Sequence, residues 1–116
     1  MSLKIFSYSK CGTCRKAIKW LEEKEIDYKL IDIIENPPSR KNILDAITQL
    51  GGVKFLLNTS GKSYREIGAS SIKALSENEV LELLVSDSKL IKRPFLISSE
   101  GIIVVGFNPS NWEKLV

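Results

Sequence analysis

The feature that most constrains the fold of this 116-residue chain is a pair of cysteines, Cys11 and Cys14, between a strand-like and a helix-like segment. Residues 3–8 alternate enough between apolar and polar side chains to predict a β-strand. The segment that follows has apolar residues at helical spacing, namely Cys14, Ala17, Ile18 and Leu21. Residues 28–34 are a second apolar, β-branched run, so residues 3–34 are predicted to form one β-α-β unit with Cys14 on the buried stripe of the helix.

The rest of the chain predicts a helical middle, then a hairpin and a last helix. Ser39 and Ser76 each precede apolar residues at helical spacing and are typical helix caps. Residues 95–98 and 102–107 are apolar runs separated by a short gap, which predicts an antiparallel hairpin. Asn108-Pro109 is then expected to begin the last helix.

This order of elements predicts an α/β protein of thioredoxin-like fold. A four-stranded mixed sheet is expected, flanked by helices, with a helical insert at about residues 39–88. No repeat, low-complexity tract or linker interrupts the sequence, so residues 1–116 are predicted to form a single domain.

The composition excludes several classes of function. The chain contains no histidine, which excludes Ser-His-Asp and Cys-His catalysis within it and every metal site that needs imidazole. Its two cysteines could supply half of a zinc site, so a zinc ion shared by two chains stays an alternative to redox chemistry. The net charge of +3 is too small to indicate a nucleic-acid or membrane partner. No apolar run approaches the roughly 18–20 residues of a membrane span, and no secretory signal is recognisable, so a cytoplasmic protein is expected.

A Cys-x-x-Cys sequence at the start of a helix is typical of a redox centre. Unpaired N–H groups and the helix dipole favour a thiolate at Cys11, and Lys10 and Arg15 add positive charge. Two residues three apart in a helical turn have Cα atoms about 5–6 Å apart, within the range of a disulfide. We therefore expect Cys11 to be the exposed attacking thiol and Cys14 the buried resolving thiol. The alternative is that both are ordinary small apolar residues.

Arg93-Pro94, directly before the third predicted strand, is the second candidate site feature. In a thioredoxin-like sheet this position places Pro94 opposite the two cysteines, where a cis peptide bond lets the backbone pair with an extended thiol substrate. Arg93 would then direct its guanidinium towards the same sulfur. The alternative is a proline that merely begins a strand beside a solvated arginine.

Three segments together resemble the arsenate reductase (ArsC)/Spx family: residues 8–17, 57–66 and 90–94. The resemblance covers essentially the whole chain, including the helical insert, and extends in particular to small members with a Cys-x-x-Cys sequence in Gram-positive bacteria. It implies the thioredoxin-like fold. We expect the substrate site around the cysteines to include Lys10, Gly12, Thr13 and Pro94.

The resemblance also implies a test for arsenate chemistry. Glutaredoxin-coupled arsenate reductases of this family use one cysteine, at the place of Cys11, and three arginines that hold the oxyanion. By local matching, one arginine corresponds to Arg93, whereas the places of the other two fall on Asn58 and Gly106. Each lost charge-assisted hydrogen bond costs about 1.5–3 kcal/mol, so weak arsenate binding is expected. Side chains that could substitute for the missing arginines are Lys62 and Arg65.

Spx regulators, in contrast, carry both Cys-x-x-Cys and Arg-Pro. They bind the C-terminal domain of the RNA polymerase α subunit, and their disulfide acts as a switch. Gly52 lies near the glycine that is important for that contact. This sequence ends soon after Trp112, where typical Spx proteins have a longer tail, and its middle segment is more similar to the reductases.

We therefore predict a cytoplasmic thiol–disulfide oxidoreductase of arsenate-reductase-like type. Its expected catalytic residues are Cys11, Cys14 and Arg93, with a disulfide between the two cysteines, no metal and no cofactor. The expected electron donor is a low-molecular-weight thiol or a protein of thioredoxin or glutaredoxin type. The alternatives are a redox-sensing, Spx-like regulator that binds the RNA polymerase α C-terminal domain and, third, a genuine arsenate reductase that closes its cycle with Cys14. No direct nucleic-acid or membrane partner is expected.

Overall fold

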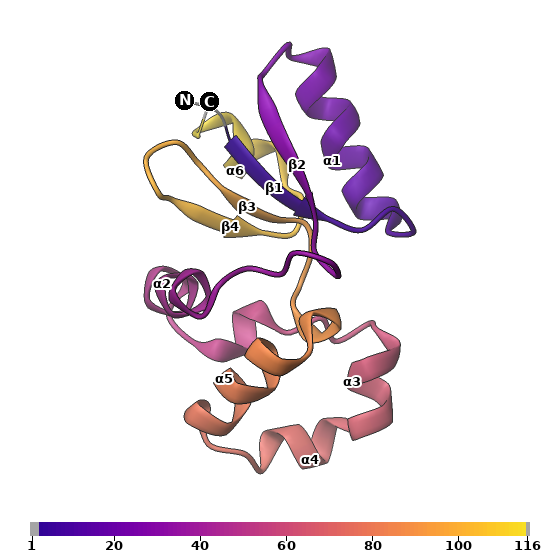
Figure 1. The fold of residues 1–116 in the computed structure, drawn as a ribbon, viewed down its shortest axis with the longest axis vertical. Coiled ribbons are helices and arrows are strands. Elements are labelled where there is room, and N and C mark those ends of the chain that lie inside the picture. The colour runs from indigo at the N-terminus through magenta and orange to yellow at the C-terminus, as the bar shows by residue number, and fades with distance from the viewer. Residues whose placement is uncertain (1–2, 116) are drawn as a thin grey trace.

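A four-stranded mixed sheet lies at the centre of the computed structural model, which describes residues 3–115. Strands β1 (Leu3–Ser7) and β2 (Tyr28–Asp32) run parallel, and β3 (Phe95–Ile97) and β4 (Ile103–Val105) form an antiparallel hairpin. Strand β1 also pairs antiparallel with β3, which gives the order β2-β1-β3-β4 (Figure 1). The predicted mixed sheet is confirmed, and its two central strands are those that precede the cysteines and follow Arg93-Pro94.

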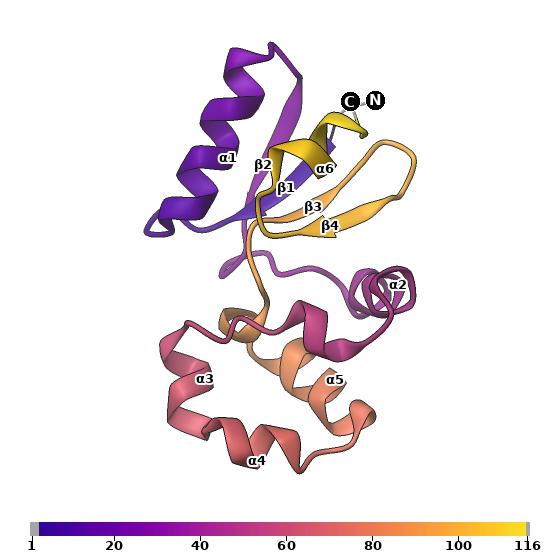
Figure 2. The same ribbon diagram turned by 180° about the vertical axis from the view of Figure 1, so that it is seen from behind.

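Helices cover both faces of the sheet. Helices α1 (Gly12–Glu23) and α6 (Pro109–Glu113) pack on one face, against the side chains of Ile5 and Leu96. The opposite face carries Phe6, Phe95 and Ile103, which join the core of the helical insert. Because successive side chains of a strand point to opposite faces, neighbouring residues of β1 and β3 serve different cores. Figure 2 shows α1 and α6 on their side of the strands.

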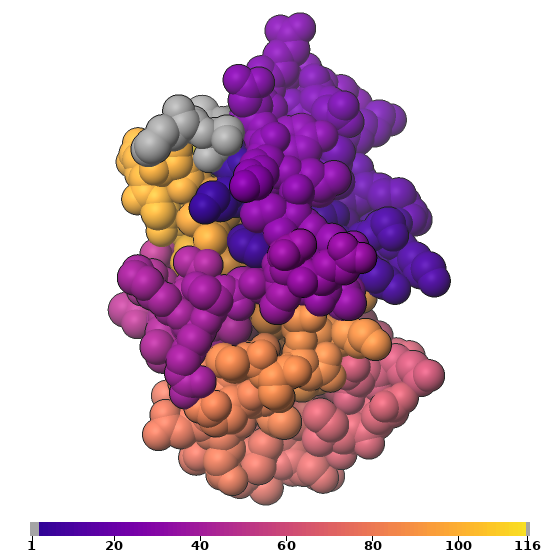
Figure 3. Space-filling model, viewed as in Figure 1, coloured from indigo at the N-terminus to yellow at the C-terminus, as the bar shows by residue number. Residues whose placement is uncertain are grey.

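The helical insert lies between β2 and β3 along the chain. Its helices are α2 (Arg40–Leu50), α3 (Lys62–Ile67), α4 (Ala69–Lys73) and α5 (Glu77–Ser86). Two 3₁₀ turns complete it, Val53–Leu56 and Ser88–Leu90. In the space-filling view the insert packs directly beneath the part of the chain that contains the sheet (Figure 3).

The ends of α2 and α5 follow from their capping residues. The Ser39 hydroxyl accepts a hydrogen bond from the N–H of Asn42, and the Ser76 hydroxyl accepts one from the N–H of Glu79. Each cap is reciprocal, since the side chains of Asn42 and Glu79 accept hydrogen bonds from the N–H groups of the two serines. Helix α2 ends at Gly51, whose φ of 92° favours glycine. Both predicted helices are confirmed.

Backbone pairing joins the segment after the first 3₁₀ turn to the segment that leads into β3. Leu57 and Ile91 form an isolated antiparallel bridge, and the N–H of Asn58 donates to the carbonyl of Leu90 at 2.8 Å. This pairing brings the segment after the first 3₁₀ turn beside the segment that leads into β3. Residues 58–61 and 92–93 therefore lie on the same side of the molecule as the start of α1.

Candidate functional site

Cys11 is the N-cap residue of α1. Its backbone is extended, with φ −96° and ψ 115°, and its Sγ accepts a hydrogen bond from the N–H of Cys14 at 3.3 Å. The loop before it is closed by a bond of 3.0 Å from the N–H of Cys11 to the carbonyl of Tyr8. The first N–H groups of a helix have no intrahelical partner, so the sulfur receives a donor that also favours its thiolate form. The predicted position of Cys11 at the helix N-terminus is confirmed.

The surroundings of Cys11 stabilise its thiolate. Partial burial raises the pKa of Cys11, but hydrogen bonds from the side chain and backbone of Cys14, together with the hydrogen bond and charge of Arg93, outweigh this effect. The net pKa of the Cys11 thiol therefore lies below its usual value. Arg93 supplies this positive charge from a distant part of the sequence, whereas the predicted contributor Arg15 directs its guanidinium to the carbonyl of Ser9 at 2.8 Å.

Cys14 lies directly behind Cys11 and has the opposite character. It is fully buried, and this burial, with the hydrogen bond and charge of Cys11, raises the pKa of Cys14 to about 11. Hydrogen bonds to the Tyr8 backbone and the Ser7 side chain only partly oppose the shift. Both cysteines are free thiols in the structure. The predicted contrast between an accessible Cys11 and a buried Cys14 is confirmed.

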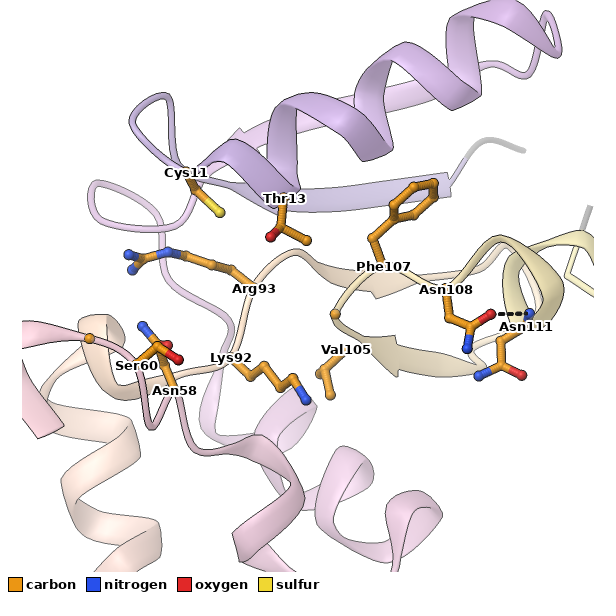
Figure 4. A pocket seen from close by; sticks show the side chains of 12 residues that line it. Cys11, Thr13, Asn58, Ser60, Lys92, Arg93, Val105, Phe107, Asn108 and Asn111 are labelled. Atoms are coloured by element: carbon orange, nitrogen blue, oxygen red, sulfur yellow. Dashed lines mark hydrogen bonds between the residues drawn. The ribbon is translucent and has the colours of Figure 1, made fainter. Parts of the chain in front are cut away.

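Arg93 lies beneath Cys11 in Figure 4, and the peptide bond between Arg93 and Pro94 is cis. Phe95, which follows Pro94, pairs with Phe6 of β1, so Pro94 lies at the end of the sheet that leads to the cysteines, as predicted. The guanidinium of Arg93 lies over the ring of Tyr8, with Cζ 4.9 Å from the ring centroid, which orients it near Cys11. Pro94 is buried, and its carbonyl accepts a hydrogen bond from the N–H of Gly106 at 2.9 Å. Arg93 thus faces the Cys11 sulfur, while the Pro94 carbonyl holds the turn at Gly106.

An open cavity of about 630 Å³ lies beside Cys11 (Figure 4). Its wall is built from four parts of the chain: the start of α1, the loop before α3, the segment before β3, and the turn from β4 into α6. The lining residues are Cys11, Thr13, Asn58, Ser60, Gly61, Lys92, Arg93, Val105, Gly106, Phe107, Asn108 and Asn111. Among the residues predicted to bind substrate, Thr13 lines this cavity, whereas Lys10 and Gly12 are exposed outside it and Pro94 is buried.

The two positions matched to oxyanion-binding arginines also line this cavity. Asn58 and Gly106 lie in its wall together with Arg93. The two side chains considered as substitutes, in contrast, have other partners. Arg65 donates to the Ser60 carbonyl at 2.7 Å, and Lys62 lies 3.7 Å from the carboxylate of Glu66.

Sequence analysis did not identify Lys92, which is the second cationic side chain in the cavity wall. The one sequence feature that could have indicated Lys92 is its position directly before Arg93, in the segment that leads into β3. Asn108 and Asn111 also line the cavity and were missed, because their pattern indicates only the start of a helix.

Among residues 3–115, no group of three or more histidine, cysteine, aspartate or glutamate side chains is arranged to hold a metal ion. No helix in the same part of the chain combines the length and hydropathy needed to cross a membrane.

A β2-β1-β3-β4 sheet with helices on both faces, and two thiols at the start of α1 opposite a cis-proline, defines a protein of the thioredoxin-like class. More specifically, the chain belongs to the ArsC family, whose family model matches residues 6–115.

Individual relatives agree with this assignment. The chain is 45% identical over 117 residues to the uncharacterized protein YusI of Bacillus subtilis, with 98% of each chain covered. It is 33% identical to the regulatory protein MgsR of the same organism, over 97% of this chain and 89% of that one. The crystal structure of an ArsC family related protein from Bacteroides fragilis matches with a TM-score of 0.90 at 37% identity, covering 100% of this chain and 98% of that one. The predicted family and fold are confirmed.

Proposed function

We propose that this protein is a cytoplasmic thiol–disulfide oxidoreductase in which Cys11 attacks a disulfide and Cys14 resolves the product. The observation that carries the proposal is the contrast between the two thiols. Cys11 is accessible from the cavity and has a lowered pKa, whereas Cys14 is buried behind it with a raised pKa. A nucleophilic thiolate in contact with a protected second thiol is what a two-cysteine exchange reaction needs.

In the first step the Cys11 thiolate attacks one sulfur of a disulfide R–S–S–R. The S–S bond of the substrate breaks, a mixed disulfide forms between Cys11 and one R–S group, and the other leaves as a thiolate that takes a proton from solvent. Arg93 stabilises the Cys11 thiolate before the attack. Thr13 lies in the cavity wall beside Cys11 and would contact the substrate there.

In the second step Cys14 attacks the sulfur of Cys11. Its hydrogen bond with Cys11 and the charge of Cys11 both raise the pKa of Cys14, and both are lost once Cys11 has formed the mixed disulfide. Burial, the largest cause of the raised pKa of Cys14, remains, so the pKa of Cys14 falls only part of the way towards its usual value. Cys14 then loses its proton, a Cys11–Cys14 disulfide forms, and the second R–S group leaves as a thiolate.

The complete reaction transfers two electrons from the protein to the substrate and needs no cofactor. A low-molecular-weight thiol, or a dithiol protein of thioredoxin or glutaredoxin type, would reduce the Cys11–Cys14 disulfide again. Pro94 contributes by accepting a hydrogen bond from Gly106, whose turn forms part of the cavity wall. Lys10 and Gly12, exposed outside the cavity, would contact only a substrate that extends over the loop before α1.

A trapping experiment tests this mechanism. Purified Cys14→Ser protein is treated with a small disulfide such as bis(2-hydroxyethyl) disulfide, and the products are identified by mass spectrometry. We expect a stable adduct on Cys11 in the variant, and an internal disulfide without an adduct in the wild type. Cys11→Ser is the matched control and should form neither product. An adduct on Cys14 in that control would reverse the assigned roles.

A specific observation also favours the second candidate, a redox-sensing regulator that binds the RNA polymerase α C-terminal domain. The chain resembles the regulatory protein MgsR. Next to Gly52, just after the end of α2, Phe55 is 46% exposed, which offers an apolar contact on the insert surface. This candidate needs a protein partner, whereas the oxidoreductase needs only the cavity and its two thiols.

A further inference from the structure

We propose that the cavity beside Cys11 selects disulfides of small thiols that carry a carboxylate, and that Lys92 binds this carboxylate. The proposal rests on the thiol–disulfide chemistry proposed for Cys11 and names its substrate class. Three features of the cavity carry it: the direction of its two cations, the glycine beneath one of them, and the chemistry and size of the remaining wall.

The two cations in the cavity wall point in different directions. In Figure 4 the Arg93 guanidinium lies beneath Cys11, while the Lys92 side chain extends the opposite way, towards Val105. Arg93 is already engaged by the Cys11 sulfur and the Tyr8 ring. Lys92 forms no ion pair with any carboxylate of residues 3–115. One cation therefore serves the reacting sulfur, and the other is available to a group elsewhere on the substrate.

Gly106 creates the space in which Lys92 lies. A Cβ atom at this position would come within 3.2 Å of Cε and 3.9 Å of Nζ of Lys92, and the φ of 73° is also unfavourable for other residues. The turn beneath the lysine is fixed from two sides. The N–H of Gly106 donates to Pro94, and its carbonyl accepts a hydrogen bond from Nε1 of Trp112 at 3.2 Å. The glycine therefore leaves room for the lysine side chain along the cavity wall.

The rest of the lining favours an anion with several polar groups. None of the described residues that line the cavity is acidic, so its two cations are not neutralised within it. At the Lys92 end, Asn108 accepts hydrogen bonds through Oδ1 from the N–H groups of Ser110 and Asn111. Its amide NH₂ group is therefore the part that can donate to a ligand. Asn58 adds a second amide at the opposite wall.

The volume of the cavity fits a whole small molecule. A cavity of about 630 Å³ lies within the range of sites that bind whole small molecules, about 300–1,000 Å³. It exceeds what a single tetrahedral oxyanion at Cys11 would fill. A small disulfide such as cystine, with one sulfur at Cys11, would direct a carboxylate towards Lys92 in the same cavity.

The protein dithiol and cystine give the Cys11–Cys14 disulfide and two molecules of cysteine, with two electrons transferred to the substrate. Dithiothreitol or another dithiol would restore the reduced protein. In a Cys14→Ser background the reaction stops after the first exchange, at one cysteine bound to Cys11 and one released.

The test compares two disulfides that differ in the carboxylate. Cystine carries one on each half, whereas cystamine has the same amines and sulfurs without carboxylates. Rates of adduct formation on Cys11 are measured in the Cys14→Ser protein by quenching and mass spectrometry. The rate for each disulfide is divided by the rate at which the same disulfide reacts with a simple free thiol. We expect a preference for cystine of about three- to tenfold, the size of a partly exposed charge-assisted contact. Lys92→Glu should reverse the preference, and Lys92→Gln should give an intermediate ratio.

The ratio of the two rates cancels any change in the reactivity of Cys11 itself. Lys29→Glu is the matched control, because it makes the same charge change on β2, at the opposite edge of the sheet from β4, and should leave the ratio unchanged. A ratio that is the same with lysine, glutamine and glutamate at position 92 would overturn the carboxylate site and leave the thiol chemistry intact. Failure of both disulfides to react with Cys11 would overturn the proposed function as well.

Discussion

Cys11 and Cys14 are separated by only two residues, yet their surroundings give them opposite acid–base properties. The sulfur of Cys11 accepts the N–H of Cys14 and faces a guanidinium, whereas Cys14 has no exposed surface and faces the charge of Cys11. The difference between the two thiols depends on Arg93, which is far away in sequence. A single substitution there separates the contribution of the cation from that of the helix.

Arg93→Met should raise the pKa of the Cys11 thiol. In the wild type the rate of alkylation by iodoacetamide should reach half of its maximum at a pH below the usual thiol range, because the folded protein favours the thiolate. Removal of the guanidinium removes a hydrogen bond and a positive charge, so the midpoint should move to higher pH. Lys16→Met, which removes an exposed positive charge from α1, is the control and should leave it unchanged. First labelling of Cys14, or an unchanged midpoint in Arg93→Met, would contradict this.

Arsenate should be a poor substrate. The positions matched to two oxyanion-binding arginines hold Asn58 and Gly106 in the same cavity as Arg93, and an amide or a bare backbone replaces a charge-assisted bond with a weaker one. Purified protein with glutathione and glutaredoxin should therefore show little or no arsenate turnover in an assay of NADPH consumption coupled through glutathione reductase. Robust turnover that is lost in Arg93→Ala would show that the remaining donors suffice.

The N-cap position of Cys11 and the burial of Cys14 could be predicted from sequence, because helix termini and buried stripes are local patterns. The position of Arg93 could be predicted from the order of the elements. Lys92 could not, because its place in the cavity depends on the missing side chain of Gly106, which β4 brings beside it across the hairpin. Spatial neighbours of this kind have no spacing pattern in the sequence.

At the scale of elements, helix α2 connects the insert to the sheet. Ile43 and Ala46 are buried in the shared core. From the same helix, the Gln49 side chain accepts a hydrogen bond from the N–H of Ile103 at 2.8 Å and donates one to the carbonyl of Gly101 at 3.0 Å. The β3–β4 hairpin, which leads into Gly106, is therefore supported by α2, a helix on the sheet face opposite to α1 and α6.

Ser39→Ala should destabilise the protein through α2. The substitution leaves the N–H of Asn42 without its side-chain acceptor and breaks the reciprocal cap, which costs about 1 kcal/mol in the free energy of unfolding. Urea denaturation followed by circular dichroism measures this change. Ser70→Ala, in the exposed face of α4, is the control and should have little effect. Equal stability of the two variants would show that the cap does not contribute.

Not every element could be predicted. Helices α3 and α4 span six and five residues, neither has a side-chain cap, and Gly68 separates them. Short helices without a cap or a clear apolar stripe are held by tertiary contacts, here through the buried Ile72, and so lack a strong local pattern. In α5, by contrast, the predicted Ser76 cap is confirmed, and the buried residues of the helix are Val80, Leu81 and Leu84.

At the scale of the whole molecule, the cavity lies at the junction of the sheet and the insert. The sheet and its flanking segments contribute Cys11, Arg93 and Gly106, and the insert contributes Asn58 and Ser60. Gly52 and Phe55 lie on the insert, outside this lining. An oxidoreductase and a regulator would therefore use different surfaces of the same molecule, which allows one titration and one rate measurement to separate them.

Isotopically labelled protein should show no saturable amide shifts around Gly52 when titrated with the C-terminal domain of the RNA polymerase α subunit. An oxidoreductase needs no protein partner at this surface, because the groups that react are the accessible Cys11 sulfur and the buried Cys14, beside the cavity. The same sample should reduce a small disulfide at a measurable rate, and the Cys11→Ser control should lose this rate while keeping the wild-type amide spectrum away from the site. Saturable shifts at micromolar concentration across residues 51–56, combined with no reduction of the disulfide, would favour the regulator.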